Sequence, residues 1–286
     1  MLYFHVTGGL GNQMFIYAVA RSIALKNNTD FSLDISTFET YKRPFLLNKF
    51  NILENYADID KVNKFIKLSE KKSFLGLLEK IKPFSMKSIW EEKDYYKYKS
   101  AVMDVPQSRD VMLKGFWQNE KYFINIRDVL LKEFTLKDGF EIKNQNLINN
   151  INNTNSVSLH IRRTDSLIKT YFGVMPINFY EEAINVIADK HDNLNLFVFS
   201  DDIKWCKENI KFNYPTTFVS DNEGLEDYQE LVAMSQCRHN IIANSTFSWW
   251  SAWLNSNPNK IVIAPKIWFA DGRSNRGLIP DTWLEI

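Results

Sequence analysis

The sequence has few cysteines, little net charge and no long apolar run. Cys206 and Cys237 are its only cysteines, too few for a disulfide framework or a paired metal-ligand motif. The 35 lysines and arginines nearly balance 34 acidic residues, so nucleic-acid binding is disfavoured. No stretch of about 20 apolar residues is present to span a membrane. Because no basic leader precedes the first strand-like segment, we expect a cytoplasmic protein with both cysteines reduced in its core.

Apolar residues are abundant enough for a folded protein of two domains. The 286 residues are 45% hydrophobic and 24% charged, which is ordinary for globular proteins. An asparagine-rich stretch over 144–155 resembles a linker. We therefore place a boundary near residue 150, giving domains 1–150 and 151–286.

The N-terminal half opens with a βαβ pattern, which is typical of nucleotide-handling α/β folds. The glycines of its turn allow the backbone to approach a ligand, with the amides of Asn12 and Gln13 facing that ligand. The pattern predicts a strand over Leu2–Val6, a turn over Thr7–Gln13, a helix over Met14–Leu25 and a strand over Phe31–Asp34.

Residues 61–99 form a basic insert with an irregular helical pattern. It holds eleven lysines and five acidic residues. A solvated helical insert is the simpler interpretation, because runs of charge usually face water. The alternative is peripheral contact with the inner membrane, with Phe74, Leu75, Leu77 and Leu78 as the apolar side of an amphipathic segment.

In the C-terminal half, strand-like and helix-like segments alternate. Such alternation predicts a mostly parallel sheet with helices on both faces. We expect strands at Ser156–Ile161, Leu194–Phe199, Thr216–Val219, His239–Ala243 and Lys260–Ile263, and helices at Pro176–Lys190, Ile203–Ile210, Leu225–Cys237 and Phe247–Leu254.

Four of these strands end in polar clusters, at 162–165, 200–202, 220–221 and 244–246. Ligands of open α/β sheets bind at the carboxyl ends of the strands, so the clusters indicate one site. Arg162 and Arg163 suit the oxygens of a diphosphate, although each could pair with a local carboxylate such as Asp165. Ser245 or Thr246 could cap the next helix and leave its first amides to bind an anion.

Asp201 and Asp202 allow three interpretations. Paired aspartates can hold a divalent ion, but the two arginines already supply the positive charge that such an ion would bring. We therefore expect no metal. Recognition of a base or ribose by one aspartate is favoured, and helix capping is the alternative.

Two other functions compete with diphosphate chemistry. The turn Thr7–Gln13 resembles a dinucleotide fingerprint without its third glycine, with Asp34 as the ribose-binding acid, which suggests a dinucleotide-dependent oxidoreductase. A non-catalytic glycan-binding module is also open, because aromatic residues make up 14% of the chain. Trp117, Trp249, Trp250 and Trp253 could stack on sugars, but helical spacing favours the core for Trp250 and Trp253.

Five motifs occur in order along nearly the whole chain: GGLGNQMFIYA at 8–18, GFWQNEKYF at 115–123, HIRRTD at 160–165, SDD at 200–202 and NSTFSWWSAWL at 244–254. Together they resemble the α-1,2-fucosyltransferases of glycosyltransferase family eleven, particularly the bacterial members. Thr164 replaces the usual glycine of the arginine motif, and Ser166 replaces an aromatic residue. Protein O-fucosyltransferases are more distantly similar.

The resemblance implies an α/β fold with two Rossmann-like domains facing a cleft (GT-B type) and mostly parallel sheets. It implies inverting transfer of L-fucose from GDP-β-L-fucose to the 2-hydroxyl of a terminal galactose in surface polysaccharide synthesis, with no metal or other cofactor. GDP-fucose and a galactose-terminated oligosaccharide would be the partners; the acceptor's identity and the oligomeric state stay open. The donor would bind in the C-terminal half and the acceptor mainly in the N-terminal half.

By this resemblance Arg162 would hold the β-phosphate and stabilise the leaving GDP. The base is left open among Asp165, Glu120 and Asp34, and Asn12 could instead orient the acceptor hydroxyl. The acceptor-binding candidates are Trp117, Gln118, Glu120 and Asp34. The donor-binding candidates are Gly9, Gly11, Gln13, His160, Arg163, Ser200, Asp201, Asp202, Asn244, Ser245, Thr246, Phe247 and Ser248.

Overall fold

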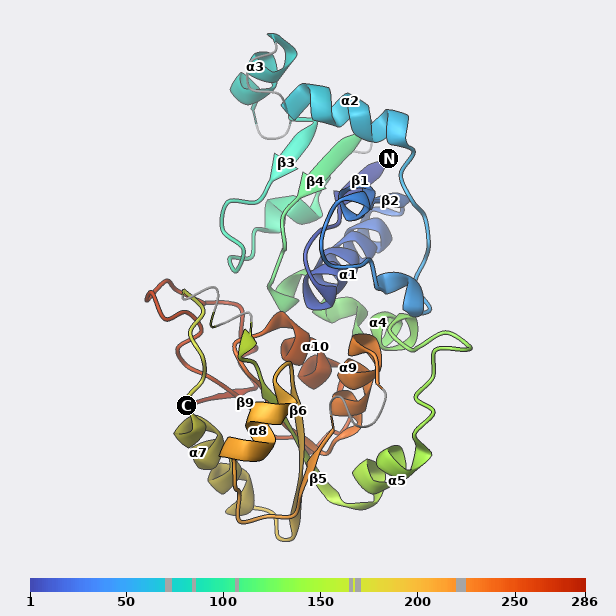
Figure 1. Ribbon diagram of the computed structural model, residues 1–286. Coiled ribbons are helices and arrows are strands. Elements are labelled where there is room, and N and C mark those ends of the chain that lie inside the picture. The colour runs from blue at the N-terminus through green and yellow to red at the C-terminus, as the bar shows by residue number, and fades with distance from the viewer. Residues whose placement is uncertain (70–73, 84–85, 106–107, 165–166, 168–170, 220–224) are drawn as a thin grey trace. The chain divides into compact units, whose positions relative to one another are not determined.

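The computed structural model describes the whole chain except residues 70–73, 84–85, 106–107, 165–166, 168–170 and 220–224 (Figure 1). It divides into two compact units, Met1–Thr135 with Arg276–Leu278 and Leu136–Asn275 with Ile279–Ile286. The division follows Thr135, earlier than residue 150. The reason is that the expected linker is a helix, α5 (Gln145–Asn153), which buries Leu147 and Ile151 in the core of the second unit.

The first unit is built on a sheet whose described strands are all parallel, in the order β2-β1-β4-β3. Its helices and strands are β1 (Leu2–His5), α1 (Leu10–Asn27), β2 (Phe31–Asp34), α2 (Ile59–Ser69), α3 (Phe74–Ile81), β3 (Ile89–Glu91), β4 (Val111–Lys114) and α4 (Arg127–Glu133). α1 begins at Leu10, earlier than predicted, because Gly9 is its N-cap in an extended conformation. The helix ends before Asn28, whose left-handed φ of 47° is common just beyond a helix end.

The sequence analysis missed β3 and β4. β3 lies within the basic insert that was expected to be helical, and both strands are too short for a periodic pattern to stand out. Burial in the sheet fixes them instead, because Trp90 of β3 and Leu113 of β4 have almost no exposed surface.

The second unit has strand order β10-β9-β8-β5-β6-β7, again with every described ladder parallel. From β5 the chain runs outward through β6 and β7, then returns to β8 and continues through β9 and β10. This is the Rossmann arrangement, so the predicted α/β fold with parallel sheets is confirmed. The remaining elements are β5 (Asn155–Ile161), α7 (Ile177–Ala188), β6 (Leu194–Ser200), α8 (Ile203–Asn209), β7 (Thr216–Phe218), α9 (Asp227–Gln236), β8 (His239–Ile241), α10 (Thr246–Leu254), β9 (Val262–Ala264) and β10 (Leu284–Glu285).

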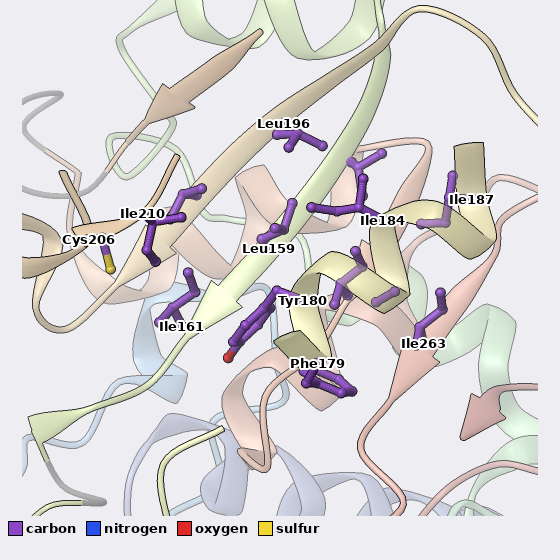
Figure 2. Packing of buried hydrophobic residues seen from close by; sticks show 14 of the residues in the cluster. Leu159, Ile161, Phe179, Tyr180, Ile184, Ile187, Leu196, Cys206, Ile210 and Ile263 are labelled. Atoms are coloured by element: carbon purple, nitrogen blue, oxygen red, sulfur yellow. The ribbon is translucent and has the colours of Figure 1, made fainter. Parts of the chain in front are cut away.

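β5 alternates between two environments. Leu159 and Ile161 belong to an apolar cluster with α7, and Figure 2 shows Phe179 and Tyr180 of α7 beside them. The Tyr180 hydroxyl donates a hydrogen bond of 3.0 Å to the His160 carbonyl, which ties α7 to the end of β5. His160, in the alternate register, directs its side chain to the other face of the sheet.

α10 is buried through its tryptophans. Trp249, Trp250 and Trp253 have at most 2% of their surface exposed, and the rings of Trp249 and Trp253 stack at 6.3 Å. The predicted core positions of Trp250 and Trp253 are confirmed. Trp249 is equally buried, so sugar stacking on these three rings was the wrong interpretation. Among the described residues, no helix combines the length and apolar character needed to cross a bilayer.

We expect Leu159→Ala to lower the free energy of unfolding by about 2–5 kcal/mol, because it opens a cavity between β5 and α7. Leu25→Ala, at an exposed position of α1, is the matched control and should cost well under 1 kcal/mol. Urea denaturation followed by tryptophan fluorescence measures both variants. Equal shifts would contradict the packing described for β5.

Candidate active site

Each sheet reverses its strand order at one pair of neighbouring strands, β1 with β4 and β5 with β8. Ligands of open parallel sheets bind outside the carboxyl ends at such a reversal. Four of the five motifs lie at the carboxyl ends of these four strands, and the fifth, at 200–202, lies at the carboxyl end of β6 next to β5. The topology therefore concentrates them at one edge of each sheet.

In the second unit Arg162 and Ser245 meet across the β5/β8 reversal. Arg162 Nη1 donates a hydrogen bond of 2.9 Å to Ser245 Oγ. The same oxygen caps α10 by accepting the Phe247 N–H at 3.3 Å. The guanidinium group is thereby held at the amino end of α10, where the first amides carry partial positive charge. Two sources of positive potential converge there, which suits an anion.

Arg163 is held differently from its neighbour. Its Nε donates to Asp202 Oδ2 at 3.2 Å, and its Cζ lies 3.5 Å from the centre of the Trp205 ring. Asp202 also caps α8 through the Trp205 N–H. Asp202 therefore caps a helix and forms an ion pair with Arg163. Both were alternatives left open by the sequence.

Asp201 fixes the start of the loop that follows Arg162. Its carboxylate accepts the N–H groups of Arg163 at 2.8 Å and Thr164 at 3.1 Å, together with the Thr164 hydroxyl. This is a positioning role, whereas base or ribose recognition had been favoured. The remaining loop residues Asp165 and Ser166, like Ser220 and Asp221, lie outside the described residues.

His160 lies beneath the same edge of the sheet, 7% exposed, with its ring 5.5 Å from that of Phe247. Burial and the nearby charge of Arg162 lower its pKa to about 4, although Asp201 opposes the shift. The ring is neutral at pH 7, so one nitrogen can donate and the other accept. Its buried Nδ1 has no partner among the described residues.

Three other polar candidates of this unit bond to nearby groups. Asn244 Nδ2 donates to the carbonyls of Phe172, Gly173 and Trp268, and the Ser248 hydroxyl donates to those of Ala243 and Ser245. Ser200 Oγ accepts the Asp202 N–H at 3.0 Å. These contacts shape the loops around the edge. Thr246 and Phe247 are half-buried at the start of α10.

In the first unit Asn12 and Gln118 meet across the β1/β4 reversal, where Gln118 Nε2 donates to Asn12 Oδ1 at 2.8 Å. Gly8 has a φ of 85°, and a Cβ there would lie 2.6 Å from Asn12 Nδ2. A Cβ at Gly9 would lie 2.6 Å from Arg43 Nη1. The glycines therefore admit Asn12 and Arg43 to the turn. Gly11 is buried in the first turn of α1.

Gln13 corrects the expectation of an amide that faces a ligand. Its side chain is fully buried, donates to the carbonyls of Gly8 and Pro44, and accepts the Leu46 N–H at 2.9 Å. These bonds join the opening turn to the segment 44–46. In this structure Gln13 is a structural residue, because its amide is saturated by backbone groups.

Asp34 is also engaged internally. His5 Nδ1 lies 2.7 Å from its Oδ2, and the N–H and hydroxyl of Ser36 both donate to its Oδ1. Burial raises the pKa of this carboxyl, but the bonds from His5 and Ser36 outweigh burial and leave the pKa lowered. Asp34 is therefore a weak base.

Glu92, which the sequence analysis missed, supports the 115–119 loop. Its Oε2 accepts the N–H groups of Phe116 at 2.7 Å and Trp117 at 2.8 Å. Trp117 is 2% exposed with a φ of 53°, rare for a bulky residue, so its ring offers little surface for a sugar. Glu120 is half-buried and begins a short 3-10 turn, Glu120–Tyr122. The sequence offered one signal for Glu92, its position directly after a strand. That signal was missed because the strand itself, β3, was not predicted.

No group of three or more His, Cys, Asp or Glu side chains in the described part of the chain is placed to hold a metal ion. Arg162 and the amino end of α10 both contribute positive potential at the edge of the second sheet.

Two parallel α/β units with polar motifs at the strand reversals are typical of enzymes that bind nucleotides. The chain belongs to the family described as Glycosyl transferase family 11, which it matches over residues 1–284. This finding confirms the resemblance noted in the sequence and makes the protein a glycosyltransferase of that family.

Relatives extend the match. The chain is 33% identical to O-antigen biosynthesis glycosyltransferase WbnK of Escherichia coli, with all of both chains covered. It is 32% identical to an alpha-1,2-colitosyltransferase of Escherichia coli, covering 98% of this chain and 97% of the relative. Human galactoside alpha-(1,2)-fucosyltransferase 1 is 27% identical, covering 58% of this chain and 48% of the human protein.

Solved structures agree on the fold. NodZ alpha-1,6-fucosyltransferase superposes with a TM-score of 0.50 at 12% identity, covering 90% of this chain and 96% of NodZ. A mutant of Arabidopsis thaliana FUT1 gives a TM-score of 0.52 at 13% identity, covering 91% and 69% respectively.

The ionisation of Glu92 should make stability depend on pH. Burial raises its pKa from 4.5 to about 7, although the two N–H donors and Lys99 oppose the shift. The native state therefore binds the proton more tightly than the unfolded state. The stability that this carboxyl contributes below pH 4.5 is lost as pH rises to about 7.

Between pH 5 and pH 8 we expect the free energy of unfolding of wild type to fall by about 2 kcal/mol relative to that of Glu92→Gln. Thermal and urea unfolding of both proteins across this range measures the difference. Glu91→Gln, at the exposed neighbouring position, is the control and should show no such trend. A Glu92→Gln curve parallel to wild type across this range would refute the buried, proton-binding carboxyl.

Proposed function

We propose that this chain transfers L-fucose from GDP-β-L-fucose to the 2-hydroxyl of a terminal galactose, with inversion at the anomeric carbon and without a metal ion. The observation that carries the proposal is the Arg162 guanidinium held by Ser245 at the amino end of α10. Membership of family 11 supports it, as do the α-1,2 linkages in the names of two relatives. A role in surface polysaccharide synthesis rests on the O-antigen relative.

On the donor side, the bond between fucose C1 and the β-phosphate oxygen breaks as an oxocarbenium-like state forms. Negative charge then builds on the departing GDP, so donors fixed at the β-phosphate stabilise the transition state more than the ground state. Arg162 and the first amides of α10 supply those donors. The neutral ring of His160 beside Arg162 is suited to a hydrogen bond with the nucleoside or sugar.

On the acceptor side, the galactose hydroxyl attacks C1 from the face opposite GDP and loses its proton to a base. The hydrogen bonds of Asp34 argue against it as that base. Glu120 and Asp165 stay as candidates, the second outside the described residues. Asn12, held by Gln118, would orient the hydroxyl.

Colitose is a second candidate for the transferred sugar, because a relative that is 32% identical over nearly the full length is named a colitosyltransferase. Colitose is fucose without its 3-hydroxyl, so either sugar can undergo the same displacement. A site that hydrogen-bonds a substrate hydroxyl rejects the deoxy analogue strongly. Parallel assays with the two GDP-sugars therefore separate the specificities.

The oxidoreductase and glycan-binding alternatives conflict with family membership. Asp34, which an oxidoreductase would use for ribose, is already bonded to His5 and Ser36. We expect GDP to raise the melting temperature and NAD to leave it unchanged in a thermal-shift assay, because a ligand that binds only the native state stabilises it. Stabilisation by NAD alone would overturn the proposal.

We expect Arg162→Ala to lower kcat by roughly a hundredfold or more, because one preorganised donor to the leaving group is lost. Arg162→Lys should recover part of the loss, since it keeps the charge but not the guanidinium fork. Turnover is measured with GDP-fucose and a galactose-terminated acceptor in the presence of chelator.

Arg238→Ala, at an exposed position before β8 and thus at the opposite edge of the sheet, is the matched control and should keep normal turnover. Near-normal turnover of Arg162→Ala would remove Arg162 from the mechanism. Complete loss of wild-type activity with chelator would contradict metal independence.

A further inference from the structure

α3 turns apolar side chains toward solvent. Leu77, Leu78 and Ile81 are exposed, Ile81 by 75%, and Met86 follows the helix at 56%. Residues 77, 78 and 81 share one face of a helix, because positions three and four apart are neighbours. Of the apolar residues singled out in the sequence, Leu77 and Leu78 thus face water.

The opposite side of α3 is anchored to the sheet through Glu79. Its carboxylate accepts the N–H groups of Ser88 and Ile89 at the start of β3, and Lys82 Nζ donates to it at 2.7 Å. This buried attachment orients the helix. The exposure of Leu77 and Ile81 is therefore imposed by the fold.

α2 has the same two-sided character. Phe65 is buried with its ring 5.3 Å from that of Tyr3, and Val62 is buried beside it. Lys61, Lys64 and Ile66 are exposed, with Ile66 on the flank of the helix next to Val62. Lys61 Nζ lies 4.0 Å from a carboxylate oxygen of Asp110, a long contact between exposed groups that leaves most of the lysine's charge toward solvent.

We propose that α2 and α3 form a docking surface for a bilayer that contains anionic phospholipid. Charge selects this partner. Residues 61–88, which run from α2 to the start of β3, hold eight lysines and two acidic residues, whereas the whole chain has a net charge of only +1, so the rest of the chain is net negative. A surface rich in anionic headgroups attracts this region and repels the remainder, while the exposed leucines and isoleucines enter the headgroup boundary.

Docking here leaves the candidate site of the first unit accessible. The Ser88 and Ile89 contacts place α3 at the end of the sheet where β3 begins, as Figure 1 shows. Asn12 and Gln118 follow the carboxyl ends of β1 and β4, at the opposite edge of the parallel sheet. A docked unit can therefore bind the bilayer and a ligand together.

The test is co-sedimentation of the full chain with vesicles of phosphatidylcholine alone or with added phosphatidylglycerol. We expect binding to the anionic vesicles, weakened by salt, and little binding to phosphatidylcholine. Ile81→Glu should lower the partition coefficient roughly tenfold, and Lys64→Glu about fivefold or more. Ile267→Glu is the matched control, because Ile267 is 67% exposed in the second unit, and it should bind as wild type does.

Three outcomes would overturn the docking surface. One is wild-type protein that sediments with neither vesicle. Another is equal loss of binding in Ile81→Glu and Ile267→Glu, which would reflect net charge alone. The last is lipid-free self-association that Ile81→Glu abolishes, seen by analytical ultracentrifugation, since a second copy would then cover the face. None of these readouts uses sugar transfer, so the outcome is independent of the proposed function.

Discussion

The bond between Arg162 and Ser245 is the interaction on which the account of the site depends. It joins the residue after β5 to the N-cap residue of α10, and so places a permanent cation at a helix amino terminus. Tyr180, Asp201 and Asn244 each fix a segment next to this contact. Most polar residues of the edge thus hold the backbone in place, while few remain to meet a ligand directly.

The same constraint acts in both units. Each of the two open parallel sheets has one reversal of strand order, where the flanking loops diverge and leave room at the carboxyl edge. The first unit spans its reversal with the Asn12–Gln118 bond, and the second does so with Arg162–Ser245. Neutral amides are suited to binding sugar hydroxyls, and a guanidinium group is suited to binding phosphate. A glycosyltransferase needs both kinds of binding group.

The sequence was sufficient for the alternation of strands and helices from β5 to β9 in the second unit, but it missed β10, whose two residues are exposed. It was insufficient for β3 and β4, which are short strands fixed by burial within the sheet, and for α5, whose asparagines concealed two core residues. Among the candidate site residues, motif position pointed to Arg162 and Ser245, which the structure joins by a hydrogen bond. Motif position could not distinguish the role of Arg162 from that of Arg163. Only the fold brings Asp202 and Trp205 into contact with Arg163. The role of Gln13 was predicted wrongly because backbone groups of Gly8, Pro44 and Leu46 saturate its side-chain amide. Pro44 and Leu46 are distant in sequence, so only the fold reveals these contacts.

The most direct test of the central claim compares the affinities of GDP and GMP by calorimetry in wild type and Arg162→Ala. If Arg162 binds the β-phosphate, the variant should lose about tenfold to a hundredfold in GDP affinity, because a charge-assisted hydrogen bond is removed. Its affinity for GMP, which has no β-phosphate, should be unchanged. Equal losses for the two nucleotides, or no loss for GDP, would contradict the assignment of Arg162 to the leaving diphosphate.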